Sequence, residues 1–147
     1  MSQQRKFEIK IKVTDADIDQ LKHANNVVYL RWAQDAAAAH WNVLSGTDIR
    51  KANAWVVLRH EIDYKYPALL NEELTLLTWV GETAGVKSVR HVEIYNSQGQ
   101  LSAAVKTTWC LIDPVTMKPK RISREMEEVL FQAGVRSKEA GDAADGE

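Results

Sequence analysis

The chain has 147 residues, 45% of them hydrophobic and 27% charged, which is the balance of a single globular domain. A formal net charge of −1 argues against binding nucleic acid through many phosphate contacts, so we expect no nucleic-acid partner. The lone cysteine, Cys110, excludes a disulfide within the chain. No segment has the apolar run of a signal peptide or of a membrane span, so we expect a cytoplasmic protein without a membrane partner.

The first part of the chain predicts a strand, an acidic loop and a long helix. Residues 7–13 alternate between apolar and charged side chains, which indicates a half-buried strand. Three aspartates then follow at alternate positions, namely Asp15, Asp17 and Asp19. From about residue 25 to residue 44 the apolar period becomes helical, which predicts a helix of about five turns.

The second part predicts four strands and a short helix. After a polar linker, residues 55–67 alternate, with Val56, Leu58, Ile62, Tyr64 and Tyr66 on one face. Further strands are expected at roughly 72–83, 86–96 and 101–113, the last two joined by a short turn into an antiparallel hairpin. A short helix is expected from about Ser123, its N-cap, to Ala133.

This order of elements predicts an α+β fold in one domain, residues 1–133, followed by a flexible polar tail, residues 134–147. A single long helix can be buried only if a mostly antiparallel sheet of about five strands curls around it. The outer face of that sheet keeps apolar side chains such as Trp79 or Trp109. Joining two such sheets edge to edge or face to face would cover them, so we expect a homodimer or homotetramer.

The acidic loop is the candidate active site. A carboxylate just before a helix N-terminus places a base beside unpaired backbone N–H donors. These are the two groups needed to attack and polarise a carbonyl. Asp15 and Asp17 are expected to be solvated loop or turn residues. A calcium loop does not fit the aspartate spacing, because Gln20 stands where glycine is needed and Asn26 where glutamate is needed.

Residues 19–30, DQLKHANNVVYL, resemble the D-x-x-x-H-V-N-N-x-x-Y-L signature of hotdog-fold acyl thioesterases. That superfamily includes the 4-hydroxybenzoyl-CoA type, bacterial acyl-CoA thioesterases and plant acyl-ACP thioesterases. Residues 62–67 resemble its second-strand segment, and the similarity extends over about residues 5–131. The resemblance implies the hotdog fold, with its central helix wrapped by a curved sheet. It also implies hydrolysis of an acyl-CoA thioester, or alternatively an acyl-ACP thioester, to acid and thiol.

The resemblance also assigns roles to residues of the acidic loop. Asp19 matches the catalytic carboxylate, acting as nucleophile or as the base that activates water. Asn26 matches the position whose backbone N–H polarises the thioester carbonyl. His23 and Asn25 match positions that order the loop, and acyl-ACP members are thought to use that histidine catalytically. These residues form the expected catalytic group.

Two departures from the family pattern bear on this assignment. Many members have glycine where this chain has Lys22. If that position needs a positive φ, Lys22 adopts it at some cost, or the loop takes another path. Members also often carry a glutamate in the first turns of the helix, where this chain has Gln34 and Asp35.

Substrate-binding residues are expected in two places. Tyr29, in the first turns of the helix, is a core residue by default but could line an acyl pocket. Lys87, Ser88 and Arg90, at the start of a strand, are candidates for the phosphates of coenzyme A, although a solvated face explains each of them as well.

No metal or further cofactor is expected. The four histidines lack metal-ligand spacing, and coenzyme A enters only as part of the substrate. By resemblance, the site lies at a dimer interface. Two alternatives remain at this stage: a hydratase or dehydratase on the same fold, and a non-catalytic thioester-binding or oligomerisation module.

Overall fold

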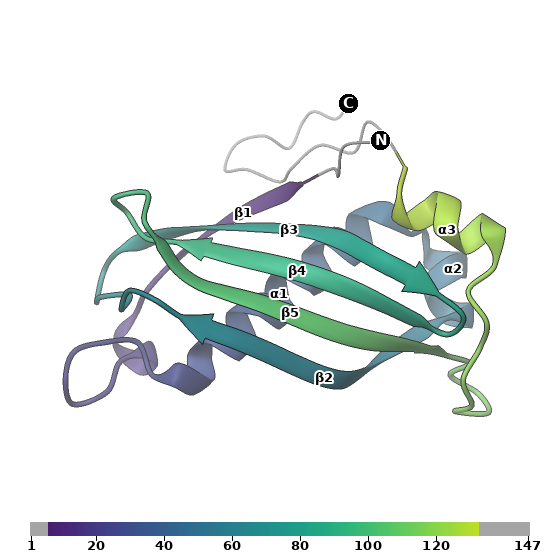
Figure 1. Cartoon of the computed structure of the whole chain (residues 1–147), viewed down its shortest axis with the longest axis horizontal. Coiled ribbons are helices and arrows are strands. Elements are labelled where there is room, and N and C mark those ends of the chain that lie inside the picture. The colour runs from purple at the N-terminus through teal and green to yellow at the C-terminus, as the bar shows by residue number, and fades with distance from the viewer. Residues whose placement is uncertain (1–5, 133–147) are drawn as a thin grey trace.

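The structure, a computed structural model, describes residues 6–132 and consists of a curved sheet and three α-helices (Figure 1). The sheet contains five strands: β1 (Phe7–Lys12), β2 (Ala54–Tyr64), β3 (Glu73–Ala84), β4 (Lys87–Tyr95) and β5 (Leu101–Ile112). Their spatial order is β1-β3-β4-β5-β2, and all neighbouring strands are antiparallel. The helices are α1 (Asn26–Leu44), α2 (Thr47–Ala52) and α3 (Arg124–Leu130).

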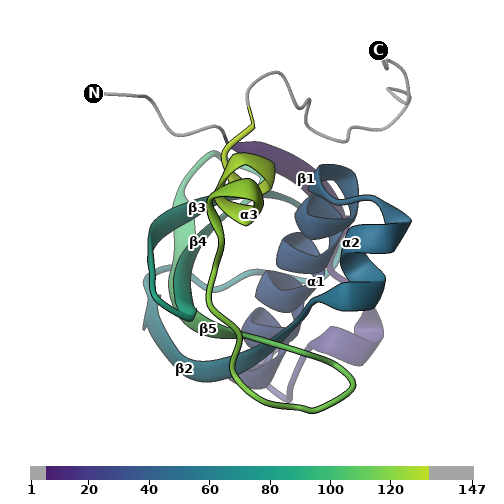
Figure 2. The same ribbon diagram turned by 90° about the vertical axis from the view of Figure 1, so that its right-hand side faces the viewer.

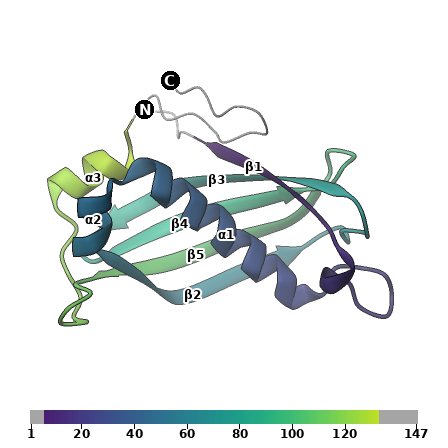
Figure 3. The same cartoon turned by 180° about the vertical axis from the view of Figure 1, so that it is seen from behind.

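The long helix α1 crosses the concave face of the sheet (Figure 3), and the sheet curls around it when viewed along the helix (Figure 2). This arrangement confirms the predicted α+β architecture and the β4–β5 hairpin. Within the described part of the chain, no helix is both long enough and apolar enough to cross a bilayer. The predicted tail, residues 134–147, lies outside the described residues.

The core forms where α1 meets the inner face of the sheet. Val28, Trp32 and Ala36 recur at helical spacing and are all buried, with Ala36 completely inaccessible. Side chains from β3, β4 and β5 pack against this stripe, among them Leu76, Ile94 and others of the same cluster. Alanine has no side chain beyond Cβ, so the sheet can approach the helix closely at these positions. The core therefore fixes the start of α1 against the sheet.

The alternation predicted for residues 55–67 is confirmed after Leu58, where Ile62 packs against the core, but it is wrong before that point, because a β-bulge lies within β2. Val57 pairs with Trp109 and Arg59 with Thr108, so Leu58 is an extra residue on β2. This insertion inverts the alternation, and Leu58 is 52% exposed where the pattern predicted a buried side chain.

The helices of the structure differ from the predicted helices in number and in where they end. Residues 47–52, expected as a linker, form α2, and α3 ends at Leu130, before the predicted Ala133. The predicted N-cap of α3 is confirmed, because the Ser123 hydroxyl accepts the Met126 N–H at 3.0 Å.

Candidate active site

The acidic loop begins with a 3₁₀ turn, Asp15–Asp17, that is anchored by a buried carboxylate. Oδ2 of Asp17 accepts the backbone N–H of Thr14 at 2.9 Å and its hydroxyl at 3.1 Å, while Arg31 Nη2 lies 2.6 Å from Oδ1. Burial opposes ionisation of Asp17, but the hydrogen bonds from Thr14 and Arg31 outweigh it and lower its pKa. Asp17 is therefore a turn residue, one of the two roles expected for it, but it is buried and not solvated, and it ties the loop to α1.

Asp19 opens a tight turn that closes at His23. The backbone N–H of Asp19 donates to the His23 carbonyl at 2.9 Å, and the N–H of Lys22 donates to the Asp19 carbonyl at 3.0 Å. The Asp19 side chain is exposed, and its Oδ1 accepts the Leu21 N–H at 2.9 Å. The turn thus holds the Asp19 carboxylate at the surface of the loop in a defined orientation.

Lys22 takes the left-handed conformation in this turn, with φ of 68°. The question raised by the missing family glycine is therefore answered: Lys22 adopts the positive φ, and the loop does not take a different path. A left-handed backbone crowds Cβ of an L-residue against the following carbonyl, so the lysine strains a position that glycine would occupy freely.

The segment between the turn and the helix is held on both sides. The Ala24 N–H donates to the Ala68 carbonyl at 2.8 Å, and the Asn25 N–H donates to the Asp17 carbonyl at 2.8 Å. Tyr29 is 2% exposed, and its hydroxyl accepts the Ala68 N–H at 3.0 Å. Tyr29 is therefore a core residue that supports the loop, which was its default interpretation.

Helix α1 starts directly after this anchored segment. The Asn25 side chain caps the helix by accepting the Val27 N–H at 3.0 Å, and Asn26, the first helical residue, is exposed. A first-turn N–H has no carbonyl partner within its own helix and carries the positive end of the helix dipole. The structure thus places Asp19, His23, Asn25 and Asn26 in one loop-to-helix segment, in which the Asp19 carboxylate is exposed and Asn26 supplies the first N–H of the helix.

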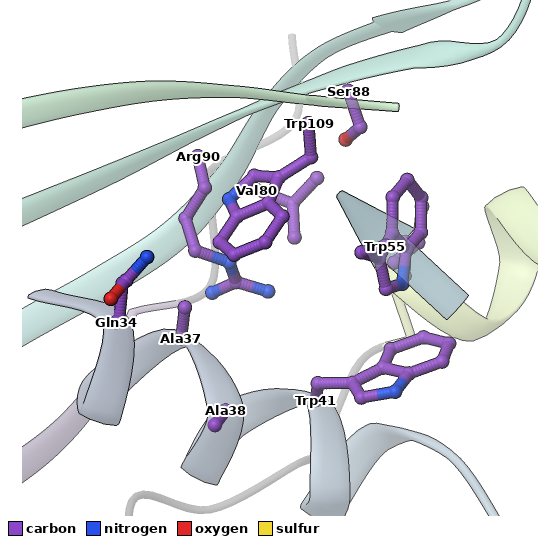
Figure 4. A pocket seen from close by; sticks show the side chains of 10 residues that line it. Gln34, Ala37, Ala38, Trp41, Trp55, Val80, Ser88, Arg90 and Trp109 are labelled. Carbon is purple, nitrogen blue, oxygen red and sulfur yellow. The ribbon is translucent and has the colours of Figure 1, made fainter. Parts of the chain in front are cut away.

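Two of the other expected binding residues, Ser88 and Arg90, line a cavity between α1 and the sheet, whereas Lys87 is not part of its lining. Its volume is about 220 Å³, and its lining consists of Gln34, Ala37, Ala38, Trp41, Trp55, Val80, Ser88, Arg90, Trp109 and Leu130 (Figure 4). Gln34, the first of these on α1, lies eight residues after Asn26, or about 12 Å along the helix. Ser88 and Arg90 are buried and Lys87 is exposed. The cavity lining includes none of the four residues of the expected catalytic group.

Arg90 is enclosed within this cavity wall and makes a polar network with α1. Its Nη1 donates to Thr78 Oγ1 at 3.0 Å and to His40 Nδ1 at 2.9 Å, and the His40 ring stacks on Phe7. Burial and the adjacent Arg90 charge lower the pKa of His40 to about 3, so His40 is neutral and accepts the bond. Burial lowers the pKa of Arg90 to about 10, which leaves it charged at neutral pH.

Sequence reasoning did not foresee the roles of His40 or of the three cavity tryptophans. A usable signal was present in β4, where Ser88, Arg90, Val92 and Ile94 share one phase of the strand. An arginine in phase with core residues indicates a polar feature inside the fold.

The histidines are dispersed across the fold. His60 Nδ1 lies 2.8 Å from the Thr107 hydroxyl, and His91 stacks on Trp79. Within residues 6–132, no three His, Cys, Asp or Glu side chains are placed to share a metal ion.

Comparison with known proteins identifies the family. The model of the acyl-ACP thioesterase N-terminal domain matches residues 3–130. The long-chain acyl-CoA thioesterase FadM of Escherichia coli is 29% identical over 132 residues, covering 86% of this chain and 98% of the relative.

Solved structures agree with this assignment. The probable thioesterase YbaW of Escherichia coli is 28% identical with a TM-score of 0.74, covering 86% of this chain and 97% of the other. A DHNA-CoA thioesterase of Staphylococcus aureus shares the fold, with a TM-score of 0.76 at 24% identity over 84% of this chain and 87% of the other. The chain belongs to the acyl-ACP thioesterase N-terminal-domain family and is a thioester hydrolase of the hotdog fold.

Proposed function

We propose that the protein hydrolyses an acyl-CoA thioester to the free acid and coenzyme A, with Asp19 and the start of α1 as its catalytic group. The observation that carries this proposal is the exposed Asp19 carboxylate, held by a hydrogen-bonded turn in the loop that leads into α1. The relative FadM, named as a long-chain acyl-CoA thioesterase, supports coenzyme A as the carrier. The family model, described from acyl-ACP thioesterases, makes the acyl carrier protein the alternative.

The chemistry needs one activated oxygen and one site for negative charge. As a base, Asp19 takes a proton from a water molecule while that water attacks the thioester carbonyl. As a nucleophile, Asp19 attacks the carbonyl itself and forms an anhydride, which water then hydrolyses. In both routes the carbonyl oxygen becomes negative, and the backbone N–H of Asn26 stabilises it as the thiolate leaves.

The neighbouring residues have supporting roles in this proposal. The Asn25 cap fixes where the helix begins, and hence the direction of the Asn26 N–H. His23 closes the Asp19 turn through its carbonyl, so it positions the loop. Lys87, exposed at the start of β4, is our candidate for a phosphate of coenzyme A.

We also propose that the protein acts as a homo-oligomer joined through β2. This strand is 11 residues long and lies at an edge of the sheet, with Val56 and Leu58 exposed. A long edge strand with exposed apolar side chains invites pairing with another strand, and a second copy supplies one. Such a dimer places a partner surface near each site, where it can contribute to binding coenzyme A.

Thiol release from a panel of thioesters tests the reaction and the carrier. The panel contains acetyl-, octanoyl-, palmitoyl- and benzoyl-CoA, together with octanoyl-ACP and the oxygen ester 4-nitrophenyl octanoate. We expect turnover of at least one acyl-CoA and faster release from octanoyl-CoA than from octanoyl-ACP. Absence of thiol release from every thioester would overturn the proposal, and faster release from octanoyl-ACP would reverse the carrier assignment.

A single turnover in H₂¹⁸O with excess enzyme separates the two roles of Asp19. If Asp19 is the base, the released acid contains ¹⁸O from the first turnover. If Asp19 is the nucleophile and water attacks the aspartyl carbonyl, the first acid contains no ¹⁸O, and mass spectrometry finds the label in the Asp19 peptide.

A further inference from the structure

An arginine occupies a core-facing position between two hydrophobic clusters of this protein. Across the inner face of the sheet, Arg90 pairs in register with Val80 on one side and Thr107 on the other. One cluster contains Val92, Val105 and the start of α1, and the other contains Val80, Leu111 and α3. Arg90 is 7% exposed at the junction of the two clusters, where an aliphatic side chain would be expected.

The positive charge of Arg90 has no counter-charge in the described part of the chain. Its two side-chain partners, Thr78 and His40, are neutral, and no Asp or Glu oxygen within residues 6–132 lies within 4.0 Å of it. An unpaired buried charge strongly destabilises a fold, so such charges are normally paired or bound to a ligand. The guanidinium lines the cavity, from which an anion can reach it (Figure 4).

A second donor on the same cavity also lacks a partner. The indole Nε1 of Trp109 is buried and has no hydrogen-bond acceptor within the described residues. Trp109 lines the cavity beside Arg90 (Figure 4). Buried donors are nearly always satisfied in native proteins, so this N–H has a hydrogen-bonding capacity that the described residues leave unused.

The remaining lining is apolar and aromatic. Trp41 and Trp55 pack edge to face at 5.8 Å, and alanines of α1 complete the wall. The volume of about 220 Å³ exceeds the roughly 150 Å³ of a cavity known to hold benzene. The site therefore combines an apolar space with donors for one anionic oxygen group at its side. A guanidinium binds carboxylate in two parallel hydrogen bonds, and the apolar wall disfavours the more strongly hydrated phosphate.

We propose that this cavity binds the carboxylate of an apolar carboxylic acid, with Arg90 and Trp109 as its donors. Two sources supply this chemistry. The first is a free carboxylic acid, which is the class of product that thioester hydrolysis releases. The second is the distal carboxylate of a dicarboxylyl thioester, in which case the cavity sets substrate choice. Only the second source rests on the proposed function.

Isothermal titration calorimetry of the full chain with octanoate and with 1-octanol tests the site. We expect octanoate to bind wild type at least about tenfold more tightly than the alcohol, because only the acid carries a charge for Arg90. Arg90→Met should remove this preference, and Trp109→Phe should weaken octanoate while leaving the alcohol unchanged. Arg124→Met, at an exposed arginine on α3, is the matched control and should behave as wild type.

Kinetics with suberoyl-CoA and octanoyl-CoA then separate the sources. If Arg90→Met lowers the kcat/KM ratio of suberoyl-CoA to octanoyl-CoA about tenfold, the site receives the substrate. If the ratio is unchanged while octanoate binding is lost, the site receives a free acid. The proposal is overturned if octanoate does not bind wild type, or binds Arg90→Met equally well. If circular dichroism shows that Arg90→Met does not fold, Trp109→Phe serves as the test. The proposal is then overturned if Trp109→Phe binds octanoate as tightly as wild type.

The calorimetry does not depend on turnover. If no thioester is cleaved but octanoate binds through Arg90, the proposed function fails and the carboxylate site stands. If thioesters are cleaved and octanoate does not bind, the proposed function stands and the carboxylate site fails.

Discussion

Two aspartates only two positions apart have opposite environments in this protein. Asp17 is 4% exposed and accepts hydrogen bonds from Thr14 and Arg31, whereas Asp19 is exposed and has one backbone donor, the Leu21 N–H. A carboxylate that is fully engaged with its own fold holds structure, and an accessible one can meet a substrate. The sequence motif selects Asp19 as the predicted catalytic carboxylate. Alternation alone could not show that Asp17 is buried, because its partner Arg31 lies 14 residues away.

Lys22 offers a direct test of strain at the residue scale. Replacing Lys22 with glycine should raise the free energy of unfolding by roughly 0.5–1 kcal/mol, because glycine adopts the φ of 68° without steric cost. Lys22→Ala removes the same side chain but keeps Cβ, so it should show no such gain. Urea denaturation of the two variants measures the difference, and equal stability would refute the strain.

His40 predicts a pH dependence of stability. Its pKa is about 3 in the folded protein against 6.5 ordinarily, so below pH 6.5 the unfolded chain binds a proton that the folded chain does not. The stability that comes from neutral His40 is therefore fully present above pH 6.5. The free energy of unfolding falls as the pH decreases from 6.5 towards 3, by up to about 1.4 kcal/mol per pH unit. His40→Asn keeps an acceptor for Arg90 without titrating. Urea denaturation between pH 7 and 5 should therefore show a shallower slope for the variant, and identical slopes would contradict the assignment.

At the scale of elements, the start of α1 decides where the N–H that we propose as catalytic points. Asn25→Ala removes the acceptor for the Val27 N–H and should lower the free energy of unfolding by about 1 kcal/mol. Asn25→Ser keeps a side-chain acceptor and should retain most of the wild-type free energy of unfolding. Thermal unfolding of both variants checks the difference. A loss of the same size in Asn25→Ser would show that the cap does not act through its side-chain oxygen.

The elements that the sequence predicted well have long, regular periodicity, as in α1 and β3. The prediction for the first part of β2 was wrong because one inserted residue, Leu58, inverts the phase of the strand, and no local pattern marks that insertion. The cavity was missed for a related reason. Its walls come from α1, four strands and α3, and only the folded sheet brings Trp41, Trp55 and Trp109 together.

At the scale of the whole molecule, the free edge of β2 predicts assembly. Leu58→Lys places a charge on that edge and should reduce the molar mass measured by light scattering after gel filtration. Val115→Lys, at a side chain that is 88% exposed in the turn after β5, is the matched control and should leave the mass unchanged. A wild type that elutes as a monomer at micromolar concentration would refute the assembly.

The fold as a whole places the two proposed sites along one helix. The loop before α1 presents a carboxylate and N–H donors, and the cavity farther along the helix presents a cation within an apolar wall. The first arrangement follows from the order of residues around Asp19, so the sequence could predict it. The second depends on packing between distant segments and appears only in three dimensions.

The steady-state kcat of Asp19→Asn, measured with the best acyl-CoA substrate of the wild type, tests most directly the claim that Asp19 is the catalytic carboxylate. The amide keeps the size of the side chain but removes the charge that activates water or attacks the carbonyl, so kcat should fall at least about 100-fold. Asp15→Asn, at another exposed aspartate of the same loop, is the matched control and should keep activity within about twofold of wild type. A folded Asp19→Asn protein with wild-type kcat would contradict the assignment of Asp19.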